Sequence, residues 1–258
     1  MMAARGELKT TDGEVEAGRA PENGMTQRLL LLSNSSNHGR GYLDHAIDEI
    51  ADFFSGVRRV AFVPFALHDQ EAYGAKAAAR LAAIGTEVTI VREDASGAAA
   101  IESADAIFVG GGNTFRLLDK LHRSGLIKDV RGRAMEGAPY LGSSAGTVIA
   151  APTIKTTNDM PIVQPPTLAS LGLVPFQINC HYLDPDPDSK HMGETRETRI
   201  LEFLEENDAT VVGVREGGWL RVEGGSVRLK GARARIFSRG REPMEYGPDT
   251  DLGFLMGR

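Results

Sequence analysis

Between residues 29 and 146, short apolar runs alternate with longer segments whose apolar residues recur at helical spacing. Leu29–Leu32 is apolar throughout, as is typical of a strand that is covered on both faces of a sheet. The following segment, Tyr42–Phe54, carries apolar residues three and four positions apart, which predicts a helix. Repeated alternation of this kind indicates βαβ units and therefore a parallel sheet flanked by helices.

The same patterns predict the remaining elements. We expect further strands at Val60–Phe65, Glu87–Val91, Ala106–Val109, Pro139–Gly142, Phe176–Asn179 and Thr210–Val214, further helices at Glu71–Ile84, after Thr114 and at about Glu194–Glu206, and an antiparallel hairpin of Trp219–Val222 with Ser226–Lys230. The sequence therefore predicts a single α/β domain over residues 25–258, with a three-layer, mostly parallel sheet flanked by helices and antiparallel strands near the C-terminus.

Composition and charge exclude several classes of protein. The 258 residues carry 29 Lys and Arg against 35 Asp and Glu, a net charge of −6, without the excess of cations that a nucleic-acid-binding protein needs. No run approaches the ~18 apolar residues that can span a bilayer. Residues 1–24 are rich in charge and lack the apolar core of a secretory signal, so we expect a disordered tail there. We therefore expect a cytoplasmic protein, monomeric or homodimeric, with neither nucleic-acid nor membrane partners.

The sharpest local motif is Gly142-Ser143-Ser144-Ala145-Gly146, which matches G-x-S-x-G with Ser144 at its centre. A predicted strand enters the motif and a helix-compatible segment leaves it, which is the context of a nucleophile elbow. The small residues allow a sharp turn that exposes the serine hydroxyl and directs the next amide towards a developing oxyanion. The motif therefore predicts that Ser144 is a catalytic nucleophile.

A serine nucleophile needs a base, and an acid that orients the base. His181 lies just beyond the predicted strand Phe176–Asn179, and strand ends of this kind gather ligand sites in open α/β sheets. Glu216 lies just beyond another strand, whereas Asp159 lies in the loop after the serine. Asp159 would give the chain order Ser, Asp, His, and Glu216 the order Ser, His, Glu; the spacing leaves both open.

A cysteine nucleophile and a metal site fit the sequence less well than a serine nucleophile does. Cys180 is adjacent to His181, and neighbouring strand residues point to opposite faces, so a small buried apolar role is favoured for the cysteine. His181 with Asp184, Asp186 and Asp188 could pass for a cation site, but the Asp-Pro alternation mainly describes a stiff acidic loop. The residues therefore disfavour a metal site at this loop.

The glycine run Gly110–Gly112 follows a predicted strand and could approach a ligand closely. A dinucleotide-binding G-x-G-x-x-G motif would require glycine where Phe115 stands, so dinucleotide binding is disfavoured. The main-chain N–H groups of Gly111 or Gly112, with that of Ala145, instead suit an oxyanion hole.

Longer blocks along the chain, from about residue 29 to about residue 240, carry more information than the pentapeptide. They are Leu29–Ser35, Gly110–Phe115, Gly142–Gly146, Pro152–Val163, Gln177–Asn179, His181, Gly193–Glu197 and Glu216–Gly217 with Trp219. Together they resemble the peptidase E, or alpha-aspartyl dipeptidase, family of serine peptidases. The resemblance implies a class I glutamine amidotransferase-like fold and hydrolysis of dipeptides that begin with aspartate, without metal or cofactor.

The resemblance also implies roles for individual residues. Ser144 matches the family nucleophile, His181 its base, and Glu216 the acid usually placed third; Asp159 matches an aspartate that has also been given that role. Arg196, in the matching Gly193–Glu197 block, is expected to bind the aspartate side chain of the substrate, because a guanidinium suits a carboxylate. The expected partner is thus a small acidic dipeptide.

Two other functions remain compatible with the sequence. A cyanophycinase-like peptidase that cleaves β-aspartyl-arginine would share the fold and the serine elbow, although this chain is short for it. A catalytically inert binding module of the same fold is disfavoured by the joint presence of Ser144, His181 and an acid.

Overall fold

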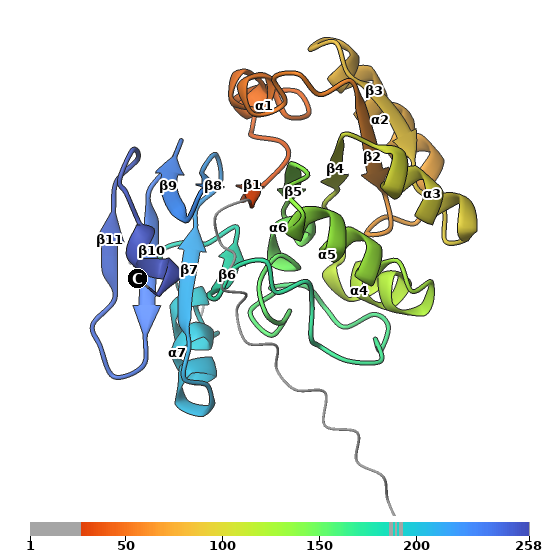
Figure 1. Cartoon of the computed structure of the whole chain (residues 1–258). Helices are drawn as coiled ribbons and strands as arrows, with labels where there is room; N and C mark the ends of the chain where they lie inside the picture. The colour runs from red at the N-terminus through yellow and green to blue at the C-terminus, as the bar shows by residue number, and fades with distance from the viewer. Residues whose placement is uncertain (1–26, 186–187, 189, 191–192, 258) are drawn as a thin grey trace, which may run out of the picture.

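The structure of the protein is a computed structural model that describes residues 27–185, 188, 190 and 193–257 (Figure 1). The tail expected over residues 1–24 lies outside the described residues. The described residues form two sheets with helices packed against them, which confirms the α/β prediction.

The larger sheet is parallel through five neighbouring strands and ends in an antiparallel hairpin. Its strands are, in sheet order, β3 (Glu87–Ile90), β2 (Arg59–Val63), β4 (Ala106–Val109), β5 (Tyr140–Ser143), β1 (Arg28–Leu32), β8 (Trp219–Glu223) and β9 (Ser226–Lys230). The hairpin of β8 and β9 is the one that the sequence predicts.

A second sheet contains four strands, whereas the sequence pattern predicts one mostly parallel sheet with antiparallel strands near the C-terminus. Its strands are, in sheet order, β11 (Met244–Tyr246), β10 (Ala234–Ser238), β7 (Thr210–Val214) and β6 (Gln177–Cys180). Only β6 and β7 are parallel; they are aligned so that Cys180 lies opposite Val214. The residues that follow these two strands therefore emerge at the same edge of the sheet.

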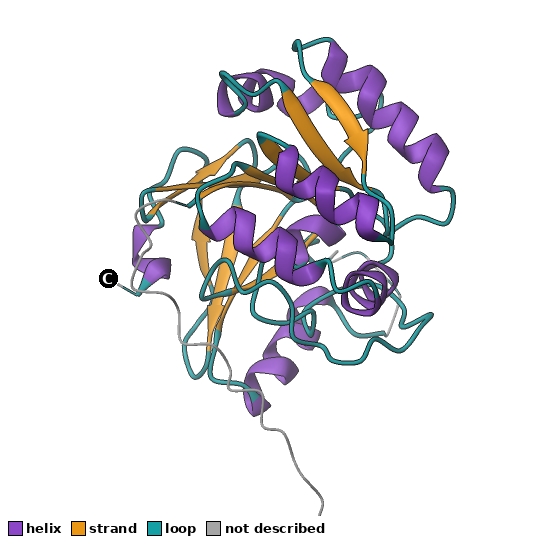
Figure 2. Cartoon of the chain, turned by 45° about the vertical axis from the view of Figure 1, so that its right-hand side comes forward, coloured by secondary structure: helices purple, strands orange, loops and turns teal. Residues whose placement is uncertain are grey.

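Helices cover both faces of the larger sheet, which gives the three layers expected (Figure 2). One face packs on α1 (Ile47–Phe53) and α2 (Gln70–Ala82), and the other on α3 (Ala95–Ser103), α4 (Thr114–Arg123), α5 (Ile127–Met135) and α6 (Ala145–Val148). In the interior strand β1, Leu30 and Leu32 contribute to the first core, whereas Leu29 and Leu31 contribute to the second. Alternate side chains of a strand point to opposite faces, so a fully apolar strand is what this position requires.

The second sheet has its own helix. In α7 (Arg196–Glu206), Ile200 and Leu204 pack against Val211 of β7 and Phe237 of β10. Two 3₁₀ helices, Asp44–Ala46 and Gly253–Met256, complete the fold. The predicted helix over Tyr42–Phe54 is correct only in its second half, because Leu43 adopts φ 60 and interrupts it before Ile47.

No helix in the described part of the chain is both long enough and apolar enough to cross a membrane.

Candidate active site

Ser144 lies in the sharp turn between β5 and α6, with backbone angles φ 50 and ψ −110. An L-residue rarely adopts a positive φ, so this turn is locally strained. The flanking glycines are required sterically: a Cβ on Gly142 would lie 2.6 Å from the carbonyl oxygen of Gly146, and one on Gly146 would lie 2.1 Å from that of Val109. The G-x-S-x-G spacing therefore produces the elbow geometry that the sequence predicts.

His181 follows β6 and is also held at a positive φ, 54. Its backbone N–H donates to Ser33 Oγ over 2.8 Å, and that hydroxyl donates to the carbonyl oxygen of Val214 over 2.8 Å. Ser33 directly follows β1, so its side chain ties the larger sheet to the ends of β6 and β7. The imidazole is thereby presented from one sheet towards the serine of the other.

The three side chains form a continuous hydrogen-bonded line. Ser144 Oγ lies 2.9 Å from His181 Nε2, and His181 Nδ1 lies 2.8 Å from Glu216 Oε1. With Nδ1–H donating to the carboxylate, Nε2 is left to accept the serine proton. The arrangement can thus remove a proton from Ser144 at the moment of attack.

Glu216 is set in place by the backbone around it. Gly217, at φ 79, donates its N–H to Asn34 Oδ1 over 2.8 Å, and Gly218 donates to the Arg215 carbonyl oxygen over 3.0 Å. The Glu216 side chain remains 59% exposed, so one of its oxygens is free to meet solvent or substrate while the other accepts from the imidazole.

The structure does not bring Asp159 to the imidazole. Its Oδ2 accepts from the N–H of Thr114 over 2.7 Å, from the Thr114 hydroxyl over 2.5 Å and from the Thr157 hydroxyl over 3.3 Å. The carboxylate thus lies at the N-terminus of α4, where the helix dipole favours negative charge. The chain order of the hydrogen-bonded line is Ser, His, Glu, and the alternative order through Asp159 is not the one observed.

The oxyanion-hole candidates separate into two kinds. The N–H of Ala145 opens α6, and neither it nor the N–H of Gly112 has an acceptor within the described chain. The N–H of Gly111, in contrast, donates to the Tyr73 hydroxyl over 2.8 Å. Ala145 and Gly112 are therefore the pair with free donors, whereas Gly111 packs closely on the elbow: a Cβ added to it would lie 3.0 Å from the Ser144 Cβ.

Tyr73 is a residue of the site that the sequence pattern does not indicate. It lies on the buried face of α2, and a Cβ on Gly110 would lie 2.6 Å from its hydroxyl oxygen, so its ring packs directly on the glycine run. Burial raises the pKa of Tyr73, so the hydroxyl stays neutral and can accept the N–H of Gly111. The spacing of Tyr73 in the helix is that of an ordinary core residue, so the sequence gives no sign of its contact with Gly111.

Arg196 begins α7 and is partly buried without an ion-pair partner in the described part of the chain. Burial and the charge of Arg199 lower the pKa of Arg196, whereas the charge of Asp159 raises it. The charge of Asp159 therefore acts on Arg196, although no ion pair joins the two side chains in the described part of the chain. An unpaired, partly desolvated guanidinium can receive a negatively charged group of a ligand.

Asp184, weighed above as a cation ligand, instead pairs with Arg215, whose guanidinium nitrogens lie 2.7 and 2.8 Å from its two oxygens. Asp186 lies outside the described residues. Among those described, no three His, Cys, Asp or Glu side chains lie together in a way that could hold a metal ion.

Cys180 is buried, with its thiol donating towards the carbonyl oxygen of Ser144 over 3.5 Å. Burial, with a smaller contribution from the charge of Asp159, raises the pKa of this thiol well above its ordinary value. A neutral, buried thiol is a poor nucleophile.

We therefore expect iodoacetamide to leave both the mass and the activity of the native protein unchanged, while the denatured chain takes up one label. Inactivation that accompanies labelling of Cys180 would contradict this assignment.

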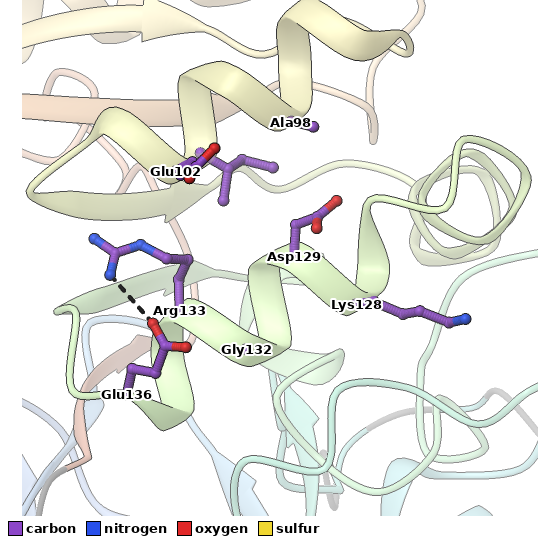
Figure 3. Close-up of a pocket in the computed structure, with 8 residues that line it drawn as sticks. Ala98, Glu102, Lys128, Asp129, Gly132, Arg133 and Glu136 are labelled. Carbon is purple, nitrogen blue, oxygen red and sulfur yellow. Dashed lines mark hydrogen bonds and ion pairs between the residues drawn. The ribbon is translucent and has the colours of Figure 1, made fainter.

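A pocket far from these side chains lies between α3 and α5 (Figure 3). Arg133, one of the cations among the described residues that line it, lies 3.4 Å from a Glu136 oxygen and donates to the Ala104 carbonyl oxygen over 2.9 Å. No serine, cysteine or histidine is among the described residues that line it. The chemistry is therefore expected at Ser144.

Comparisons with known proteins identify the family of this chain. The model of a family described as "Peptidase family S51" matches residues 29–230. Peptidase E of Streptomyces coelicolor is 56% identical over 233 residues, covering 88% of this chain and 94% of that protein. A protein of Drosophila melanogaster named "Probable alpha-aspartyl dipeptidase" is 44% identical over 234 residues, covering 89% of this chain and 98% of its own.

A solved structure of a peptidase from an acI-B1 Actinobacterium shares the fold. It superposes with a TM-score of 0.69 at 15% identity, covering 89% of this chain and 98% of that one. The family match over most of the chain and the two close relatives together show that this chain belongs to peptidase family S51.

Proposed function

We propose that this protein is a serine dipeptidase that hydrolyses Asp-X dipeptides through an acyl-enzyme intermediate. The observation that carries the proposal is the hydrogen-bonded line from Ser144 through His181 to Glu216, built on an exposed elbow. The similarity to proteins named peptidase E and alpha-aspartyl dipeptidase supports the substrate class.

In the proposed mechanism, Ser144 Oγ attacks the scissile carbonyl carbon as His181 Nε2 takes its proton. The carbonyl oxygen becomes an oxyanion that the N–H groups of Ala145 and Gly112 stabilise, and Glu216 holds the imidazolium through Nδ1–H. His181 then protonates the leaving amine, and the C–N bond breaks to leave an aspartyl ester on Ser144. A water, deprotonated by the same imidazole, hydrolyses the ester and restores the serine.

The charges of the substrate match those near the serine. The β-carboxylate of the N-terminal aspartate would pair with Arg196, and the α-ammonium would lie near Asp159, whose Oδ1 has no partner among the described residues. Each charged group must be compensated when the site loses water, because an unpaired buried charge is costly. We therefore assign Asp159 to ammonium binding and Glu216 to orienting the base.

We further propose that the protein works in the cytoplasm, as a monomer or homodimer, on small acidic dipeptides and without nucleic-acid or membrane partners. The net charge of −6 and the single cysteine support this location and these partners.

A panel of four substrates tests the proposed function. Purified protein is assayed on Asp-Leu, Glu-Leu, Ala-Leu and N-acetyl-Asp-Leu, with released leucine measured by chromatography. We expect kcat/KM for Asp-Leu to exceed that for each of the other three by about 10²-fold or more. Ala-Leu lacks the side-chain carboxylate, N-acetyl-Asp-Leu lacks the α-ammonium, and Glu-Leu carries its carboxylate one methylene further out. Arg196→Met should narrow the preference for Asp-Leu over Ala-Leu, whereas Arg199→Met, on the same helix, should not. Equal rates on all four substrates would contradict the proposed recognition of the substrate's side-chain carboxylate and α-ammonium.

A further inference from the structure

A pocket of about 280 Å³ opens beside the serine and extends towards α2. Ser144, His181 and Gly112 lie at its reacting end, whereas Lys76, from α2, and Tyr42 line it elsewhere. Arg196, the guanidinium assigned above to the aspartate, is not among its lining residues. Among the described residues that line this pocket, Lys76 is the one lysine or arginine.

The Lys76 ammonium is held over this pocket without being neutralised. Its Nζ lies 4.7 Å from the centre of the Tyr42 ring, within range of a cation–π interaction. Lys76 forms no ion pair within the described part of the chain. On the neighbouring 3₁₀ helix, Asp44 is already paired with Arg80 over 2.8 Å and accepts the Gly41 N–H over 2.7 Å. No Asp or Glu is among the described residues that line the pocket.

The proposed substrate supplies the missing anion. In a dipeptide the leaving residue ends in a free carboxylate only two bonds beyond the nitrogen that His181 protonates, and successive Cα atoms are about 3.8 Å apart. The leaving nitrogen must lie beside His181 Nε2, which opens onto this pocket. The carboxylate is thus carried into the space that Lys76 and the hydroxyl-bearing Ser35 and Ser36 line.

We propose that Lys76 binds the C-terminal carboxylate of the leaving residue, so that this pocket selects dipeptides over longer peptides. The inference rests on the proposed function. In a tripeptide a neutral amide stands where the dipeptide has its carboxylate, and the amide offers no charge to the ammonium. Lys76 is therefore a specificity-determining residue, and its contribution should appear only with substrates that carry the free carboxylate.

The test compares Asp-Leu with its C-terminal amide, which differs only in that charge. For the wild-type protein we expect kcat/KM to be about tenfold higher for Asp-Leu, as a charge-assisted hydrogen bond gives. Lys76→Met should lower kcat/KM for Asp-Leu about tenfold, mainly through KM, and leave the amide unchanged within twofold. Lys76→Arg should restore much of the preference, and 0.5 M NaCl should weaken it because the pair is partly exposed.

Lys128→Met is the matched control, because Lys128 is also an exposed helical lysine but lies at the remote pocket of α5. It should leave both substrates unaffected. If Lys76→Met lowers kcat/KM equally for Asp-Leu and for its amide, or lowers neither, the inference is overturned while the proposed function stands. If the wild-type protein hydrolyses neither substrate, both the proposed function and the inference that rests on it fail.

Discussion

Replacing Ser144 by alanine should lower kcat/KM for Asp-Leu by about 10⁶-fold, the loss found when a serine peptidase loses its nucleophile. The mechanism has no substitute for this oxygen: the buried Cys180 thiol contacts the Ser144 carbonyl oxygen and is kept neutral. The remaining Ala145 and Gly112 N–H groups should still bind an oxyanion, which leaves a residual rate above that in water. Leucine release over long incubations measures the effect.

Ser143→Ala provides the control for this experiment. Ser143 is the neighbouring serine, fully buried at the end of β5, and its replacement removes a hydroxyl of the same size. We expect this variant to stay within about tenfold of the wild-type kcat/KM. Thermal unfolding followed by circular dichroism should show both variants folded, since alanine has no greater difficulty than serine with the φ of 50 at position 144. A folded Ser144→Ala protein with near wild-type turnover would refute the acyl-enzyme mechanism.

The parts of the site that depend on local geometry were predictable from the sequence. The elbow at Ser144 needs only its two glycines and the strand before them, because their missing Cβ atoms are what permit the turn. The position of His181 at a strand end likewise follows from the short predicted strand Phe176–Asn179, which the structure places at Gln177–Cys180. In both cases the physical cause lies within a few residues of the side chain concerned.

The choice of the third residue depended on pairing between distant strands. Cys180 lies opposite Val214 because β6 and β7 are parallel and in this register, which places His181 and Glu216 just beyond the same edge. Asp159 lies closer to Ser144 in sequence, yet its loop carries it to the start of α4. The alternatives could be separated only once the partner of β6 was known.

Elements with weak patterns were also missed. The helix α3 (Ala95–Ser103) is alanine-rich, with only Gly97 and Ile101 buried, so its amphipathic signal is faint. The strands β10 and β11 belong to the second sheet, and the sequence pattern that predicts the hairpin of β8 and β9 does not predict them. Their formation depends on pairing with β7, which is a tertiary contact that overrides local propensity.

Separate replacement of Glu216 and Asp159 should affect different kinetic constants: kcat for Glu216 and KM for Asp159. Glu216→Gln keeps the size of the side chain but removes the charge that holds the imidazolium, so we expect kcat for Asp-Leu to fall by about 10²–10⁴-fold with little change in KM. The lower part of that range suits a carboxylate that is 59% exposed. Steady-state kinetics on both variants, with thermal unfolding as the check on folding, measures the split.

Asp159→Asn should raise KM instead, because we assign its carboxylate to the substrate ammonium, whereas the imidazole is hydrogen-bonded to Glu216. The amide can still accept from Thr114, so the start of α4 should be preserved and the loss should come from charge. An analogue without the ammonium, N-acetyl-Asp-Leu, should then be no worse for Asp159→Asn than for the wild-type protein, whereas Glu216→Gln should slow it as it slows Asp-Leu. The reverse pattern, with kcat falling more for Asp159→Asn, would require the loop around Thr157 to move the carboxylate onto His181 during turnover and would return Asp159 to the role of orienting acid.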